Sequence, residues 1–303
     1  MRAAGDRYSS RARAAQFTLG AARCTVVSDG SIDAGSLAEA LVDSAIQLPA
    51  PFDVSTRVTL DINLLVVEVD GLRVLFDAGA GSGARLGQAM FGASVGNATA
   101  ALRATGIDPS SIDLVALTHA HPDHAWGLID DEDRPCFPNA WIAIATDELD
   151  HWMSAPRLAA EEGELTRWIR SGARRSLCAY ENRIIAADEG ELVTASVTVR
   201  KASGHSPGHV AYEIASGGER LVCWGDLCHH PVLLADPALN FTFDHDPAGA
   251  VKSRMELLTG LAGTDTAVLA YHLPFPGLGR VATCSDQGYM WCPGDTRHLR
   301  YHP

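Results

Sequence analysis

Three histidines and one aspartate crowd into residues 118–126, which read THAHPDHAW. Neutral imidazole and carboxylate are good ligands for zinc and for its first-row neighbours. His119 and His121 can both reach one ion, whereas Asp123 and His124 point elsewhere and suit a second ion close by. A polar loop with coincidental histidines is the simpler alternative, but the cluster takes three of the twelve histidines in the chain. We therefore predict a metal site with room for two ions.

Four apolar runs, which we expect to be strands, each lead into a residue type that binds metals. Open α/β sheets tend to place their sites at the carboxyl ends of strands, where ligands stand on rigid supports. One such residue after a strand would mean little, whereas four predict that the residues come together in one metal site. The runs are 112–117, 191–199, 220–224 and 266–271.

The three later runs supply four candidate residues. His205 follows the second run in a tight turn and is the stronger ligand candidate there. His209 ends the same turn, and we expect it to form hydrogen bonds behind the site. Asp226 follows the third run and could bridge two ions, because a carboxylate has one oxygen for each. His272 follows the fourth run and repeats the pattern.

The remaining elements follow from hydrophobic periodicity and turn residues. The apolar segments 64–69 and 73–76 flank Asp70-Gly71, which predicts a hairpin. We expect Asp77 to be a buried residue beneath the metal cluster. A first hairpin is predicted from residues 17–20 and 24–27, with its turn at 28–30, and residues 31–57 are expected to be mostly loop. Helices are predicted over 84–105, 146–152 and 157–171 and from Asp246-Pro247 onward.

The composition and net charge of the chain limit the kinds of function it can have. The chain has 303 residues, of which 47% are hydrophobic, and we expect a flexible arm over 1–16 and a single catalytic domain over 17–303. A net charge of -13 argues against a nucleic-acid partner. Neither a membrane span of about 20 apolar residues nor a secretory signal is recognisable, so we expect no membrane association.

The seven cysteines are an odd number in a long chain, which favours reduced thiols and a cytoplasmic protein. Cys223 and Cys228 flank Asp226, and Cys284 and Cys292 could lie close together in a terminal hairpin. Free thiols, buried or at the surface, are the simpler interpretation for all of them.

The order and spacing of these motifs resemble the metallo-β-lactamase superfamily over about residues 17–292. The resemblance rests on HAHPDH at 119–124, GHSPGH at 204–209, Gly225-Asp226 and His272. The chain looks closest to the branch that contains methyl parathion hydrolase and related lactonases and arylesterases. The segments that carry this finer resemblance are 77–81, 225–231, 243–247 and 272–279.

The resemblance implies an α/β fold, an αβ/βα sandwich in which two mixed β-sheets lie face to face between outer helices. It also implies a cofactor of two divalent metal ions, with zinc the first expectation and manganese, cobalt or iron(II) the other metals that such ligands accept. Asp226 is expected to bridge the two ions, and Asp123 also to orient the nucleophile. By motif position, one ion is held by His119, His121 and His205, and the other by Asp123, His124 and His272.

We therefore expect a dinuclear-metal-dependent hydrolase that attacks a small-molecule ester or lactone with a hydroxide shared by the ions. A phosphotriesterase would use the same metals, and a sulfur or oxygen oxidoreductase of this fold would need iron. A true β-lactamase, a nuclease and a non-catalytic binding protein are further alternatives. Candidate pocket walls, each with core packing as an equal alternative, are Trp126, Trp152, His229 and Phe275. An apolar surface around the first loop is compatible with a homodimer.

Overall fold

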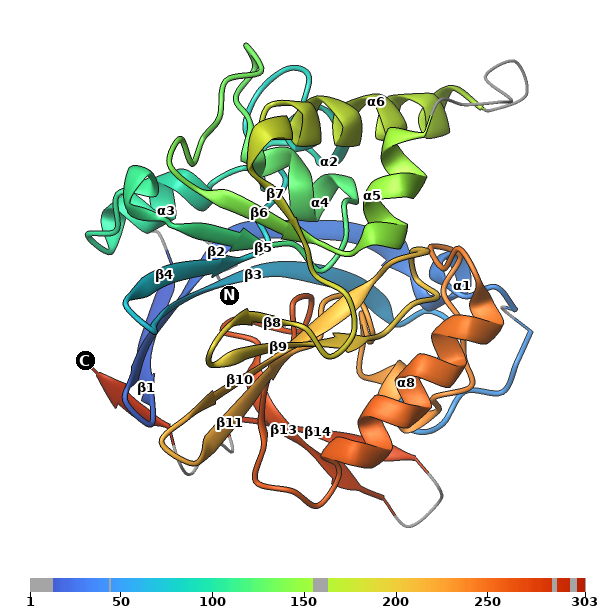
Figure 1. Ribbon diagram of the computed structural model, residues 1–303. Helices are drawn as coiled ribbons and strands as arrows, with labels where there is room; N and C mark the ends of the chain where they lie inside the picture. The colour runs from blue at the N-terminus through green and yellow to red at the C-terminus, as the bar shows by residue number, and fades with distance from the viewer. Residues whose placement is uncertain (1–12, 44, 155–162, 285–287, 295–298, 303) are drawn as a thin grey trace, which may run out of the picture.

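Two mixed β-sheets lie face to face at the centre of the protein, and helices cover their outer faces (Figure 1). The computed structural model describes residues 13–43, 45–154, 163–284, 288–294 and 299–302. This arrangement confirms the fold class expected from the sequence.

The first sheet has eight strands among the described residues. In spatial order they are β15 (Arg300–His302), β1 (Ala14–Leu19), β2 (Ala22–Ser36), β3 (Arg57–Val69), β4 (Leu72–Phe76), β5 (Leu114–Ala116), β6 (Trp141–Ile144) and β7 (Ile184–Ala186). Strands β4 to β7 run parallel to one another, and the other pairs are antiparallel.

The second sheet has seven strands in the described part of the chain. In spatial order they are β14 (Tyr289–Pro293), β13 (Leu278–Thr283), β12 (Ala267–Leu269), β11 (Glu219–Cys223), β10 (Val210–Ser216), β9 (Val197–Lys201) and β8 (Leu192–Thr194). Only β11 and β12 pair in parallel here.

Helices pack on both outer faces of the sandwich. The helices that follow or precede strands of the first sheet are α2 (Gly87–Phe91), α3 (Ala98–Ala104), α4 (Pro122–Ala125), α5 (Thr146–Met153) and α6 (Glu164–Cys178). Those on the second sheet are α7 (Val232–Ala235) and α8 (Pro247–Leu261), and α1 (Leu37–Ala40) joins the same apolar cluster while contacting β2 and β3 of the first sheet. Short 3₁₀ helices within the described residues are η1 (Pro109–Ser111), η2 (Trp126–Leu128) and η3 (Glu181–Arg183).

Strand β3 shows how the sequence builds these layers. Its residues Leu64 and Val66 face the helices on the outside of the first sheet, whereas Leu65 and Val67 face the core between the sheets. Successive side chains of a strand point to opposite faces, so a strand that is covered on both faces must be apolar throughout. The predicted β3–β4 hairpin is confirmed, and Asp70 and Gly71 both have positive φ, as its tight turn requires.

Several expected boundaries were wrong. The first hairpin turns at Gly20 and Ala21, and β2 runs on through residues 28–30 with a shift in its register. The segment 31–57, expected to be loop, begins with the end of β2 and α1. Strand β1 starts at Ala14, inside the expected N-terminal arm, whose residues 1–12 lie outside the described part.

The helix expected over 84–105 is two helices, α2 and α3, because the chain has positive φ at Gly92 and Gly96. At Gly96 a side chain would also lie 2.7 Å from the carbonyl oxygen of Gly81. The helix expected over 157–171 is α6, and residues 155–162 lie outside the described part. The start of α8 is confirmed, with Asp246 as N-cap before Pro247.

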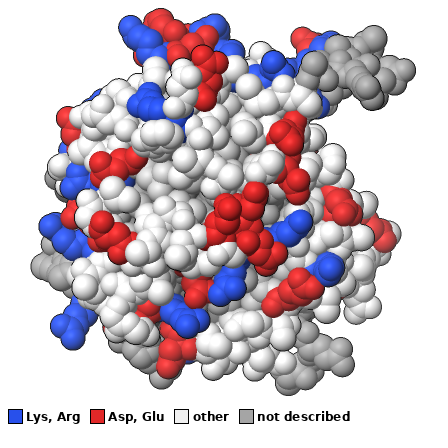
Figure 2. Space-filling view, viewed as in Figure 1, with Lys and Arg blue, Asp and Glu red and all other residues white. Residues whose placement is uncertain are grey.

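No helix among the described residues is long and apolar enough to span a membrane. On the face shown in Figure 2, Asp and Glu side chains gather near the centre while Lys and Arg are scattered, in keeping with the net charge of -13.

Candidate metal centre

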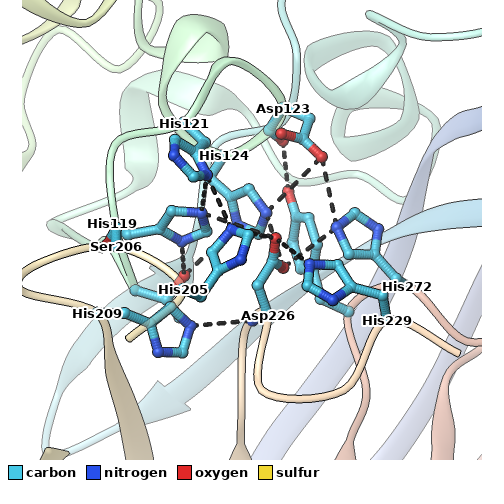
Figure 3. A network of polar contacts seen from close by, with 12 residues as sticks. His119, His121, Asp123, His124, His205, Ser206, His209, Asp226, His229 and His272 are labelled. Carbon is cyan, nitrogen blue, oxygen red and sulfur yellow. Dashed lines mark hydrogen bonds and ion pairs between the residues drawn. The ribbon is translucent and has the colours of Figure 1, made fainter. Parts of the chain in front are cut away.

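The predicted ligands converge at one end of the sandwich, in the loops that follow β5, β9, β11 and β12 (Figure 3). Both sheets therefore contribute, because β5 belongs to the first and the other three strands to the second. The donor atoms fall into groups whose atoms lie within 4.8 Å of one another. The predicted ligands make up two of them: the first group is His119, His121, His205 and Asp226, and the second is Asp123, His124 and His272. A further set joins Asp226 and His272 to His229, which the sequence offered only as a pocket wall.

The first group is a close set of imidazole nitrogens. His121 Nδ1 lies 2.9 Å from His119 Nε2 and 2.9 Å from His205 Nε2. Burial, and then neighbouring imidazoles, hold the pKa values of His119 and His121 well below the usual value. These two rings are therefore neutral near pH 7, which is the form that binds a metal.

The second group combines two imidazoles with a carboxylate. His272 Nε2 lies 3.4 Å and His124 Nε2 3.8 Å from Asp123 Oδ2. Asp123 is the least buried of the three residues, with 9% of its surface exposed. Solvent thus reaches this group from the side of the carboxylate.

Asp226 stands between the groups and presents one oxygen to each (Figure 3). Its Oδ2 lies 3.1 Å from His205 Nε2, on the side of the first group. Its Oδ1 lies 3.0 Å from His124 Nε2 and 3.1 Å from His272 Nε2, on the side of the second. Burial favours the neutral carboxyl, but the surrounding imidazoles, His124 foremost, hold its pKa well below the usual range. The carboxylate is therefore charged and placed as a bridge.

Unsatisfied polar atoms test whether metal ions fit this arrangement. His124 Nε2 and Asp226 Oδ1 are buried without a hydrogen-bond partner, although they lie 3.0 Å apart. Leaving such atoms unpaired costs about 1–3 kcal/mol each. An ion bound by both atoms would remove that cost, and the nitrogen and carboxylate donors are those that zinc and its neighbours prefer. The residues present therefore fit a pair of first-row dications.

Contacts behind the ligands fix which imidazole nitrogen faces the site. His124 Nδ1 lies 2.9 Å from Asp77 Oδ2, and His272 Nδ1 lies 2.9 Å from the carbonyl oxygen of Asp61. Each partner accepts a hydrogen bond from the Nδ1–H group, so that Nε2 carries a lone pair that can bind an ion. Asp77 is thus a buried residue beneath the cluster, as expected from the sequence.

His205 is held in the same way by a charged network. Its Nδ1 lies 3.1 Å from Asp244 Oδ1, and Asp244 Oδ2 lies 3.6 Å from Arg254 Nη2. Arg254, which is 1% exposed, also donates to the carbonyl oxygens of Leu227, Pro237 and Leu239. One arginine of α8 therefore supports the backbone after Asp226 and the partner of His205.

His209 lies behind the site, as expected. Its Nδ1 contacts the carbonyl oxygen of Ala202 at 2.9 Å, and its Nε2 accepts a hydrogen bond from the Asp226 backbone N–H at 2.9 Å. Burial lowers the pKa of His209 to about 3, so the ring is neutral and can accept this bond.

The structure brings two of the four candidate pocket residues to the centre. The Trp152 ring lies edge-on to His121, with ring centroids 5.8 Å apart. His229 Nε2 lies 3.1 Å from Asp226 Oδ2. The side chain of Phe275 instead packs against the core between the sheets, and its ring lies under the Arg13 guanidinium.

Trp126 is fully buried and packs in the core, which is the alternative that the sequence left open for it. It packs with Leu86 and Ile129, and its ring centroid lies 6.0 Å from that of Trp168. A side chain at Gly172 of α6 would lie 2.2 Å from the indole, so the missing side chain there makes room for it.

Sequence reasoning missed Glu148, Arg254 and Asp61. Nothing local marks them, because their contacts to the centre are made by residues distant in the chain. Asp244 lies in the segment 243–247 that carried the finer resemblance, so that motif could have indicated it.

Comparison with known proteins agrees with this geometry. The model of the metallo-beta-lactamase superfamily matches residues 58–272. A search of curated protein sequences finds no match. Among solved structures, AidC, a dizinc quorum-quenching lactonase in complex with a product, N-hexanoyl-L-homoserine, is 28% identical with a TM-score of 0.82 over 94% of this chain and 98% of AidC. The hydrolase AbOPH of the beta lactamase superfamily is 26% identical, with a TM-score of 0.80 over 94% of this chain and 98% of its own.

A probable metal-dependent hydrolase from Staphylococcus aureus is 21% identical with a TM-score of 0.67, over 84% of this chain and 90% of its own, and shows the fold alone. AidC and AbOPH, which this chain resembles over nearly its whole length, are both hydrolases, and the two ligand groups of this chain could each hold a metal ion. The family model covers most of the chain, and a histidine or aspartate stands at every ligand position of the motif. The chain therefore belongs to the metallo-β-lactamase superfamily.

Proposed function

We propose that this protein hydrolyses a small-molecule ester or lactone with two bound zinc ions. The observation that carries the proposal is the position of Asp226, which presents one carboxylate oxygen to each of two ligand groups. The similarity to AidC, which is a dizinc lactonase, supports both the metal and the substrate class.

The chain's own residues divide the work of binding. His119, His121 and His205 would hold one ion, Asp123, His124 and His272 the other, and Asp226 would join them. Two such ions, when bound, polarise a carbonyl oxygen and lower the pKa of a coordinated water towards neutrality.

Asp123 is placed to orient the attacking water. Its carboxylate is the partly exposed member of the second group, so one oxygen can accept a hydrogen bond from water that enters the site. His229 and Trp152 stand beside the two groups and would contact the substrate or the leaving group.

An apolar rim beside the centre suits a substrate with a hydrocarbon part. Phe243, 39% exposed, lies edge-on to His229 with ring centroids 5.8 Å apart. Burying an acyl chain against the exposed ring of Phe243 would add binding energy of about 0.8 kcal/mol per methylene, and so favours an acylated lactone over a small polar ester.

Elemental analysis of the purified protein, run beside a hydrolysis screen, tests the proposal. The screen holds aryl esters, N-acyl homoserine lactones, phosphotriesters and a chromogenic β-lactam. Two zinc ions per chain with lactone or ester turnover are expected. Turnover of phosphotriesters alone would move the protein to that class, and one iron per chain without hydrolysis would refute the proposal.

A further inference from the structure

Glu148 of α5 is a fully buried carboxylate that accepts four hydrogen bonds. Its Oε1 accepts from the Ala120 backbone N–H at 2.9 Å and from Trp152 Nε1 at 2.6 Å. Its Oε2 accepts from Ser206 Oγ at 2.7 Å and from the Gly208 backbone N–H at 2.9 Å. Each oxygen thus has two donors.

Three of these donors belong to the two loops that carry the histidines of the first ligand group, and the fourth, Trp152, lies on α5 itself. Ala120 lies between His119 and His121, and Ser206 directly follows His205. The first loop follows a strand of the first sheet and the second follows a strand of the other sheet, 28 and 58 residues from Glu148 in sequence. One side chain therefore joins the two halves of the sandwich beside one ligand group.

The turn after His205 is shaped for this contact. A side chain at Gly208 would lie 2.2 Å from the backbone nitrogen of Glu148 and 2.6 Å from its Cβ. Gly208 has an ordinary φ, so glycine serves here to let the turn approach α5 rather than to permit an unusual backbone. A second observation, independent of the hydrogen bonds, thus places the turn against Glu148.

The second ligand group is supported by other residues. His124 and His272 contact Asp77 and the backbone of Asp61, and the hydrogen bonds described for Glu148 reach neither. The two groups do share Thr118, whose Oγ1 lies 3.0 Å from His119 Nδ1 and 3.4 Å from His124 Nδ1. The contacts of Glu148, in contrast, are made beside the histidines of the first group alone.

We propose that Glu148 is a positioning residue that sets the affinity of the ion held by His119, His121 and His205 and leaves the other ion unaffected. The inference rests on the proposed two-ion function. Through Trp152, whose ring lies beside His121, the same carboxylate also fixes the wall of the site next to this ion.

Glu148→Gln is the variant that tests the inference, because it keeps the size and shape of the side chain. An amide offers one acceptor oxygen and two N–H donors, so two of the four contacts would bring donor against donor. Loss of a group that orients metal ligands typically weakens binding about 10–100-fold. We expect a loss of this size for one ion only.

Each site is isolated by removing a ligand from the other. In a His272→Ala background the remaining ion belongs to the first group, and in a His205→Ala background to the second. Zinc affinity is measured in both backgrounds by competition with a chromogenic chelator. Glu148→Gln should weaken zinc about 10–100-fold in the first background and leave it unchanged in the second. Asp147→Asn removes a charge from the same helix at an exposed position and should change neither affinity.

Ser206→Ala provides a milder variant if Glu148→Gln does not fold. It removes one donor and keeps the carboxylate, so it should weaken zinc in the His272→Ala background alone. Equal weakening in both backgrounds, or in neither, would overturn the inference. A wild-type protein that fails to bind two zinc ions would instead refute the proposed function on which the inference rests.

Discussion

Replacing Asp226 by asparagine should remove one of the two ions and nearly all hydrolysis. The side chain is buried, and its two oxygens face different ligand groups at 3.0–3.1 Å from their imidazole nitrogens. Asparagine keeps the shape and one acceptor oxygen. Its amide nitrogen has no lone pair for a metal, so only one group would retain an oxygen ligand from this position.

Charge sets the size of the effect. Asp123 and Asp226 are the only carboxylates among the proposed ligands, and together they balance half of the charge of two dications. After the substitution a single carboxylate balances a quarter. Changing a residue that only orients a ligand costs about 10–100-fold in metal affinity. Losing a direct, charged ligand should therefore cost more than about 100-fold, which corresponds to about 2.8 kcal/mol.

The assay is zinc content after dialysis against a buffer with fixed free zinc, followed by hydrolysis of an N-acyl homoserine lactone and of phenyl acetate. Wild type should retain two ions and Asp226→Asn one, with turnover reduced more than about 100-fold in step with the lost ion. Asp147→Asn, a matched change at an exposed site, should behave as wild type. If Asp226→Asn kept two ions and a tenth or more of the turnover, the bridging role would be wrong.

The remaining predictions concern stability and access. Arg254→Met removes the cation that faces the Asp244 carboxylate and the donor to three carbonyl oxygens. The free energy of unfolding, measured by denaturant titration, should therefore fall by about 3–5 kcal/mol. Lys252→Met, on the exposed side of α8, should change it little. Removing the metal with a chelator should lower the melting temperature, because each bound ion stabilises the fold by about 4 kcal/mol when the free metal concentration is about a thousand times its Kd. A melting temperature that did not change on adding the chelator would argue against zinc in the folded protein. At pH 8 a thiol reagent should label the exposed Cys178 and Cys284 at once, whereas Cys24, whose pKa burial raises to about 12, should react only on unfolding; rapid labelling of Cys24 would contradict its burial.

The ligand positions could be predicted because the signals are local. Each candidate follows an apolar run within a few residues, and the carboxyl ends of strands that run in the same direction lie at one end of a sheet. The hairpin of β3 and β4 was predictable for the same reason, since Asp70-Gly71 lies between two apolar segments and favours a tight turn with positive φ.

The carboxylate of Asp29, whose partners are distant in sequence, contributes to two wrong boundaries. Local rules place Asp beside Gly in a turn, but Asp29 is fully buried and accepts hydrogen bonds from the backbone N–H groups of Ala80, Gly96 and Ala98. These bonds hold β2 extended where a turn was expected. They also start α3 at Ala98, which separates it from α2. Neither effect is visible in a window of neighbouring residues, because the partners are 51–69 positions away.

At the candidate metal centre, Glu148 is likewise a buried carboxylate whose partners are distant in sequence. In the sequence it is one of two acidic residues in the first turn of a helix, and the neighbouring Asp147 has the same charge and the same local setting. Only the folded chain distinguishes them, since Asp147 faces solvent while Glu148 meets donors from both sheets. A buried carboxylate needs such donors to offset its desolvation, so the position of Glu148 and the approach of the two ligand loops stabilise each other. Motifs can therefore identify the atoms that bind ions, whereas the residues that hold those atoms in place have to be found in the structure.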